Sequence, residues 1–158
     1  MECIFVPKVL VDADGCPVID LTIEIAKDYN LHVILICDTS HRIEREGAVT
    51  VLVDKGNDAV DFVLVNRVEK GDIVVTQDYG LAAMVLAKKG YAINQNGLVY
   101  TMDNIDRLLH IRHISKKARR SGNRVKGPKK RSIEDDYKFA HSFTRLCENV
   151  CNNDNNVM

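Results

Sequence analysis

Aspartate side chains follow four short hydrophobic runs in the first half of the chain, at or just beyond the point where each run ends. Carboxylate oxygens are ligands that Mg²⁺ and Mn²⁺ prefer, and two such ions can stabilise the attacking water and the leaving oxygen of a phosphodiester. If the fold brings these acids together, they indicate metal-dependent hydrolysis of phosphodiesters. In chain order they are Asp12 and Asp14, Asp38, Asp54, and Asp78.

The four hydrophobic runs predict the strands of a parallel β-sheet. They cover residues 9–11, 33–36, 49–53 and 73–75, and their β-branched side chains suit strands that are covered on both faces. The segments between them carry helical signals: Pro17 opens one helix and Asn30 closes it, and residues 58–68 and 79–89 predict two more. This alternation predicts a three-layer α/β/α fold with a mainly parallel central sheet.

The second half of the chain adds two short strands and two helices to this prediction. Residues 91–93 and 98–100 are the strand candidates, and Thr101 is placed to cap a helix that runs to about Arg120. Residues 121–131 predict a loop, and an amphipathic pattern predicts a last helix over about 133–149. We therefore expect a single domain over residues 8–149, and a disordered tail over 150–158 because that segment is polar and rich in asparagine.

Parallel strands end at the same edge of a sheet, which is where open α/β sheets bind ligands. Asp58 and Asp61 lie one helical turn apart, so they share a face of the helix that follows the third strand. Together with the acids after the strands, about six or seven carboxylates then approach one crevice. Such a cluster raises its own pKa values unless a cation neutralises it, which predicts Mg²⁺ or Mn²⁺ as a cofactor.

Helix capping is the structural alternative for several of these aspartates. An aspartate between a strand and a helix can accept hydrogen bonds from the first backbone amides of that helix. Asp38 and Asp54 fit this alternative as well as they fit metal binding, and Asp78 is well placed to cap the helix that follows it. Asp12 and Asp14 fit it less well, because two acids separated by one residue at the end of a buried strand can both be ligands.

Basic residues are concentrated in one segment, although the formal net charge of the chain is zero. Residues 111–131 hold ten Lys and Arg residues and no acid, which leaves 12 basic and 22 acidic residues elsewhere. Such a segment can bind the phosphates of a nucleic acid, can contact the acidic body of the protein, or can be solvated. Lys129, Lys130 and Arg131 are the strongest candidates in it for substrate binding, and RNA is the partner we expect.

His41 and Arg42 follow the second predicted strand at the same edge of the sheet. Both side chains can contact a phosphate, and the histidine can also transfer a proton. A plain surface loop explains the pair equally well.

The composition argues against a membrane protein. The chain has no run of eighteen apolar residues, and its start lacks the pattern of a secretion signal. Its five cysteines are scattered without paired spacing, which favours reduced thiols. We therefore expect a cytoplasmic protein without a membrane partner.

Four motifs stand out in the chain, over residues 11–18, 53–61, 71–82 and 127–132. They resemble those of the YaiI/YqxD family of uncharacterised bacterial proteins, and the likeness runs from about Lys8 to Leu146. The resemblance implies a PIN-domain-like fold with an acidic site of the kind found in PIN nucleases. It also implies metal ligation by Asp12, Asp14, Asp58, Asp61 and Asp78, of which Asp12, Asp14 and Asp78 are the catalytic candidates. Two departures are Gly15, where the family more often has alanine, and the absence of a glutamate from the acid set.

The leading functional hypothesis from the sequence is a divalent-metal-dependent nuclease acting on RNA. One alternative is a nucleic-acid-binding module with a PIN-like scaffold and no catalysis. A second is a phosphatase, because Asp12-Ala13-Asp14-Gly15 also resembles the Asp-x-Asp-Gly element of haloacid-dehalogenase-like phosphatases, with Asp12 as nucleophile and Asp14 as general acid.

Overall fold

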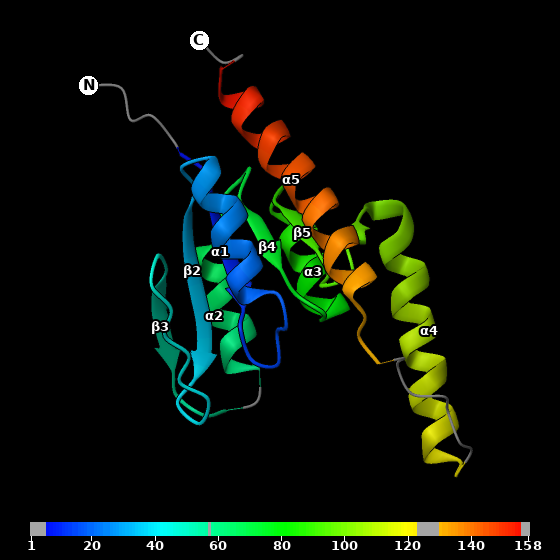
Figure 1. Ribbon diagram of the computed structural model, residues 1–158. Coiled ribbons are helices and arrows are strands. Elements are labelled where there is room, and N and C mark those ends of the chain that lie inside the picture. Colours follow the sequence, from blue (N-terminus) through cyan, green and yellow to red (C-terminus); the bar gives the residue numbers. More distant parts are fainter. Residues whose placement is uncertain (1–5, 57, 123–129, 156–158) are drawn as a thin grey trace.

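The chain folds into three layers, with helices on both faces of a central sheet (Figure 1). The computed structural model describes residues 6–56, 58–122 and 130–155. The expected three-layer α/β/α architecture is confirmed. None of the helices in those residues is long and apolar enough to cross a membrane.

The sheet is parallel except at one edge. Its strands lie in the order β3-β2-β1-β4-β5-β6, and only β6 is antiparallel to its neighbour among the described strands. Every hydrophobic run that predicted a strand forms one, with ends that differ by at most two residues from those expected. The bounds are β1 Lys8–Asp12, β2 His32–Asp38, β3 Val49–Val53, β4 Ile73–Val75, β5 Tyr91–Ile93 and β6 Val99–Tyr100.

The central strands are continuously apolar because helices cover both of their faces. On one face, α1 (Ile19–Asp28) and α5 (Ile133–Asn155) pack over the sheet, and Phe139 and Phe143 of α5 are fully buried there. On the other face lie α2 (Ala59–Arg67) and α3 (Tyr79–Ala87), with Leu64 and Leu81 in the core. The first helix begins two residues later than the sequence predicts, at Ile19, with Val18 as its N-cap residue.

Helix α4 (Met102–Arg120) begins at the predicted cap, Thr101. The Thr101 side chain accepts from the backbone amide of Asn104, and the Asn104 side chain accepts from the backbone amide of Thr101. The first turns of α4 pack beside α3, whereas its basic C-terminal half extends away from the sheet (Figure 1).

The sequence predicted a disordered tail from residue 150, and this prediction is wrong for residues 150–155, which are helical. Helix α5 continues to Asn155, because Val150 is buried in the same core as Phe143 and Cys151 packs partly against it. The polar composition of 152–156 hid this apolar contact, which extends the helix past its expected end at 149. Residues 156–158 lie outside the described part of the chain.

Candidate metal centre

The candidate site lies where the order of the strands reverses direction. From β1, the chain places β2 and β3 on one side of the sheet, and it places β4 and β5 on the other. Loops that leave β1 and β4 therefore diverge and open a crevice beyond the carboxyl ends of these strands. Asp12 ends β1, and Thr76 directly follows β4, so both residues border this crevice.

Asp12 is held by a hydrogen bond from Thr76. The hydroxyl of Thr76, a residue that is 2% exposed, donates to Oδ2 of Asp12 over 2.9 Å. Burial raises the pKa of Asp12, and the charges of Asp78 and Asp14 raise it further, whereas the hydrogen bond from Thr76 lowers it. Asp12 is therefore an oriented carboxylate whose negative charge is poorly solvated.

Asp78 has a structural role as well as a position in the site. Its Oδ1 accepts from the backbone amides of Gly80 at 2.8 Å and Leu81 at 3.2 Å, so the capping alternative from the sequence is confirmed for this oxygen. Nη1 of Arg112, from α4, lies 3.4 Å from the same oxygen. The backbone amide of Asp78 donates to the hydroxyl of Thr76 over 3.0 Å, which ties it to Asp12 through one side chain.

A cleft of about 480 Å³ opens among these groups. It contains the three aspartates that the sequence analysis assigned to catalysis, together with one cation. It is lined by Asp12, Asp14, Gly15, Gln77, Asp78, Tyr79 and Arg112.

A second cleft of about 350 Å³ holds the other two predicted ligands, Asp58 and Asp61. It shares Asp78 and Arg112 with the first cleft, so the two clefts adjoin. The pKa of Asp61 is raised to about 7 by burial, and then by the charges of Asp78 and Asp12. The five carboxylates named by the family resemblance therefore lie along two adjoining clefts, while Asp54 is exposed and lines neither.

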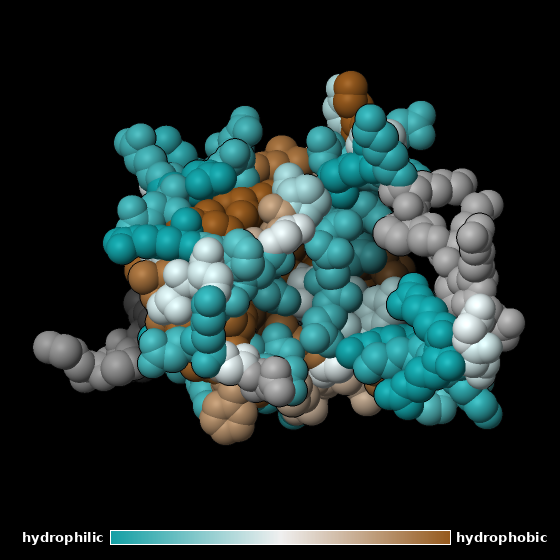
Figure 2. Space-filling view, turned by 90° about the horizontal axis from the view of Figure 1, so that it is seen from below, coloured by the Kyte–Doolittle hydropathy of each residue, from teal (hydrophilic) through white to brown (hydrophobic). Residues whose placement is uncertain are grey.

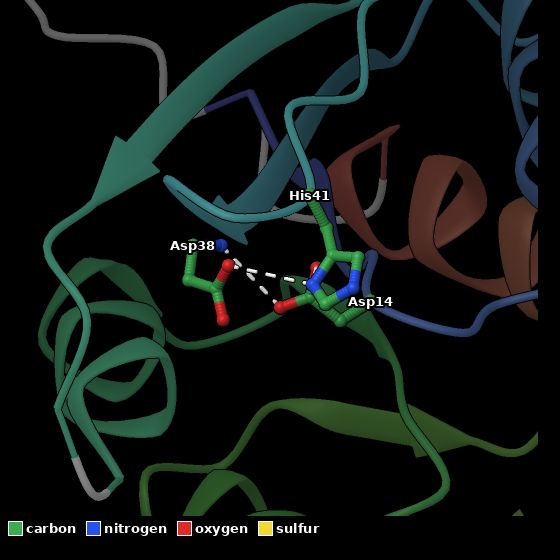
Figure 3. Close-up of side chains that lie close together, drawn as sticks. All are labelled: Asp14, Asp38 and His41. Atoms are coloured by element: carbon green, nitrogen blue, oxygen red, sulfur yellow. Dashed lines mark hydrogen bonds and ion pairs between the residues drawn. The ribbon is translucent and has the colours of Figure 1, made fainter.

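Asp14 also faces a second group of possible ligands, shown in Figure 3. Nδ1 of His41 lies 3.5 Å from Oδ1 of Asp38 and 3.9 Å from Oδ1 of Asp14. The backbone amide of Asp38 donates to Oδ2 of Asp14 over 3.3 Å. Burial raises the pKa of Asp38, but hydrogen bonds from Ser40 and the charge of His41 outweigh it, so the net shift is downward. Asp38 therefore favours its charged form beside Asp14.

The residues present fit a divalent cation. Oδ1 of Asp14 is buried and accepts no hydrogen bond within the part of the chain that the structure describes. In that part, Asp14, Asp38 and His41 are the three side chains of ligand type whose donor atoms lie within 4.8 Å of one another. Asp12 and Asp78 line the first cleft with Asp14, and Asp61 lines the adjoining cleft, so further carboxylate oxygens lie near this group. An oxygen-rich donor set of this kind suits Mg²⁺ or Mn²⁺.

The predicted substrate-binding residues lie in three different settings. Lys130 is exposed, whereas Lys129 lies outside the described residues. Arg42 is exposed and paired with Glu44 over 2.6 Å, and it lines neither cleft.

Figure 2 shows that hydrophilic residues cover much of the face toward which the strands point, with hydrophobic residues exposed between them.

The guanidinium of Arg131 is occupied by other parts of the protein. It donates to Oδ1 of Asp136 over 2.9 Å and 2.6 Å, to Oδ1 of Asn96 over 2.8 Å, and to the carbonyl of Gln95 over 2.9 Å. These bonds join the start of α5 to the turn between β5 and β6. The described contacts of Arg131 therefore give it a structural role.

Sequence reasoning missed two residues of the site. Arg112 belongs to the basic segment, but its register on α4 decides that it, and not a neighbouring cation, reaches Asp78. Thr76 is of a residue type that is common in strands and follows β4 directly, yet its side chain joins Asp12 to Asp78. Its position directly after a buried strand and two residues before an aspartate was the available signal.

Comparisons with known proteins give a family and no activity. Residues 10–149 match the family described as "Uncharacterized BCR, YaiI/YqxD family". The UPF0178 protein of Exiguobacterium sibiricum is 58% identical over 139 residues, which cover 88% of this chain and 95% of that protein. The UPF0178 protein of Clostridium acetobutylicum is 50% identical over 141 residues, with 88% and 95% covered. No solved structure matches the chain significantly.

Proposed function

This chain belongs to the YaiI/YqxD family, which is described as uncharacterised, and we propose that it is a divalent-metal-dependent nuclease that hydrolyses phosphodiester bonds of RNA. The observation that carries the proposal is the grouping of Asp14, Asp38 and His41, whose ligand atoms lie within 4.8 Å of one another beside the acidic clefts at the switch point of the sheet. Structural carboxylates are usually neutralised by nearby cations, but here Arg112 is the only cation that lines either cleft among the described residues.

The protein would hold its cation with Asp14, Asp38 and His41, and the carboxylates of Asp12, Asp61 and Asp78 offer further oxygen ligands along the two clefts. When bound, Mg²⁺ or Mn²⁺ would supply charge stabilisation for phosphoryl transfer and would activate water. Asp58, exposed at the mouth of the second cleft, completes the acid set that the family resemblance implies.

The chain's own residues have separate tasks in this proposal. Thr76 orients Asp12 and keeps its carboxylate in one position. Arg112 supplies a guanidinium at the junction of the two clefts, where it can bind a phosphate oxygen. His41 lies beside Asp14 and can accept or donate a proton at Nδ1. The exposed cations of α4, among them Lys116 and Lys117, attract the polyanionic substrate.

The test is cleavage of RNA by the purified protein in the presence of Mn²⁺. Single-stranded and hairpin RNA are incubated with wild-type protein, with Asp12→Asn, and with Asp54→Asn as the matched control. We expect cleavage that needs the metal, is lost in Asp12→Asn and is retained in Asp54→Asn. Equal cleavage by wild type and Asp12→Asn would rule out the proposed site.

A binding module without catalysis is the second candidate, and the structure of Asp78 favours it. One oxygen of Asp78 is already committed to the cap of α3 and to Arg112, as expected of a scaffold residue. A binding module should bind RNA in a salt-sensitive manner, lose affinity when Lys130 is neutralised and be indifferent to Asp14→Asn. Release of inorganic phosphate from an aryl phosphate, dependent on Asp12, would instead support the phosphatase alternative.

A further inference from the structure

The second cleft has an apolar wall that metal chemistry does not require. Phe62 and Val65 of α2 and Leu81 and Met84 of α3 line it. Phe62 is 72% exposed and Met84 is 45% exposed. Single exposed apolar side chains are common, but two that border one cleft beside an acidic site indicate contact with a ligand.

This apolar wall adjoins the position where a phosphate would bind. Arg112 and Asp78 belong to both clefts, so a phosphate held by Arg112 would lie at their junction. Gly80 keeps this junction open: a Cβ there would lie 3.3 Å from Oδ1 of Asp78 and 3.8 Å from Nη1 of Arg112. Asn66 supplies an amide in the second cleft that can donate and accept hydrogen bonds.

We propose that the second cleft is a nucleobase subsite, in which Phe62 stacks on an unpaired base of single-stranded RNA whose adjoining phosphate contacts Arg112. This inference rests on the proposed function and extends it to the form of the substrate. Met84 and Val65 form the rest of the apolar surface, and Asn66 lies within the same cleft for contact with the edge of the base.

The charges around the cleft favour this occupant over an apolar ligand. A purely apolar molecule would leave Asp58 and Asp61 without a neutralising partner and would make no use of Arg112. An RNA strand presents a phosphate for the arginine, a flat face for Phe62 and, with its bound cations, a counter-charge for the acids. The basic half of α4, which begins near Arg112, extends the cationic surface beyond the cleft for further phosphates.

Stacking on Phe62 requires a base that is out of a duplex. In a double helix both faces of each base are covered by neighbouring pairs, so a paired base must first be unstacked before it can reach the ring. Removal of an aromatic stacking partner weakens single-strand binding by roughly 5- to 150-fold per base. The subsite therefore predicts discrimination between single-stranded and duplex RNA that depends on Phe62.

The test uses a short RNA with 2-aminopurine at one position, single-stranded or annealed, and Ca²⁺ in place of Mn²⁺ to limit cleavage. Wild type should quench the fluorescence of the unpaired 2-aminopurine and bind the single strand more tightly than the duplex. Phe62→Ala should weaken single-strand binding about 5- to 150-fold, with little change for the duplex, and Phe62→Trp should retain binding. Tyr137→Ala is the matched control, because Tyr137 is 73% exposed on α5, across the sheet.

The outcomes separate this inference from the proposed function. Asp12-dependent cleavage by a Phe62→Ala variant with unchanged affinity would overturn the subsite and leave the nuclease proposal intact. Phe62-dependent binding of the single strand by a protein without cleavage would support the subsite and contradict the nuclease. Equal losses for single strand and duplex, or no binding of RNA at all, would overturn the subsite.

Discussion

The hydroxyl of Thr76 donates a hydrogen bond of 2.9 Å to Oδ2 of Asp12. The same oxygen of Thr76 accepts from the backbone amide of Asp78, so one small side chain contacts both Asp12 at the end of β1 and Asp78 at the N-cap of α3. Thr76→Val keeps the shape of the side chain but removes both bonds. We expect about a 10- to 100-fold loss of metal affinity or activity, and a loss of about 1 to 3 kcal/mol in the free energy of unfolding because a partly buried amide loses its acceptor.

Thr76→Ser is the control for this variant, because serine keeps the hydroxyl and loses only a methyl group. Metal affinity measured by titration calorimetry, and stability measured by urea unfolding, should both recover in the serine variant. Wild-type metal affinity in Thr76→Val would show that Asp12 needs no orientation and would remove Thr76 from the site.

Divalent cations should stabilise the folded protein if the acids hold them. At a free Mn²⁺ concentration of about 100 times the Kd, the free energy of unfolding should rise by about 2.7 kcal/mol, because the ion binds only the folded state. Asp12→Asn and Asp14→Asn should show a much smaller rise. Asp54→Asn should behave as wild type, since Asp54 lines neither cleft. Urea unfolding with and without Mn²⁺ measures the difference, and a similar rise in all four proteins would place the ion elsewhere.

Asp61 should make the metal-free protein less stable as the pH rises. Its pKa is about 7 in the folded protein and near 3.8 in the unfolded chain, so the folded state binds its proton more tightly. The favourable contribution is complete below pH 3.8 and is lost as the pH rises to about 7. Between these limits we expect wild type to lose about 1 kcal/mol relative to Asp61→Asn, since partial exposure screens the repulsion.

Urea unfolding of both proteins in a metal chelator, across this pH range, measures the effect. Asp54→Asn serves again as the control and should follow wild type, because Asp54 is exposed at the end of β3. Parallel pH profiles for wild type and Asp61→Asn would contradict the raised pKa that burial and the charge of Asp78 give Asp61.

The strands and their order of appearance followed from the sequence, because a buried parallel strand must be apolar on both faces. Val49–Val53 and Ile73–Val75 have the bounds expected from their hydrophobic runs. The end of α5 did not follow, because Val150 is one apolar residue before a polar segment. Only its burial against the core shows that the helix continues.

The site was predictable to the extent that the direction of the strands determines it. Parallel strands place Asp12 and Asp78 at one edge, and Asp58, the N-cap residue of α2, lines the same cleft as Asp61 in the first turn of that helix. Contacts between distant segments were not predictable in this way. The approach of Arg112 to Asp78 depends on how α4 packs on α3, and the meeting of His41 with Asp14 depends on the conformation of a loop.

Arg131 and Lys130 are adjacent in sequence, but they should respond differently to substitution. The guanidinium of Arg131 is committed to Asp136, Asn96 and the carbonyl of Gln95, and its side chain is 22% exposed. Arg131→Ala should therefore lower the free energy of unfolding by roughly 1.5 to 3 kcal/mol, the range for hydrogen bonds to a charged group. Lys130 is exposed, so Lys130→Ala should leave stability within about 0.5 kcal/mol of wild type.

For RNA binding we expect the larger effect at Lys130 and not at Arg131. A cation that is not committed to a protein carboxylate can bind a phosphate and release its counterions. Lys130→Ala should reduce the slope of log affinity against log salt by about one unit, and Arg131→Ala should leave this slope unchanged while it destabilises the fold. Fluorescence anisotropy over a salt series, at a temperature where both variants are folded, measures the slopes. A reduced slope in Arg131→Ala would mean that its guanidinium leaves Asp136 for a phosphate, and the sequence-based assignment of Arg131 to substrate binding would then stand over the structural one.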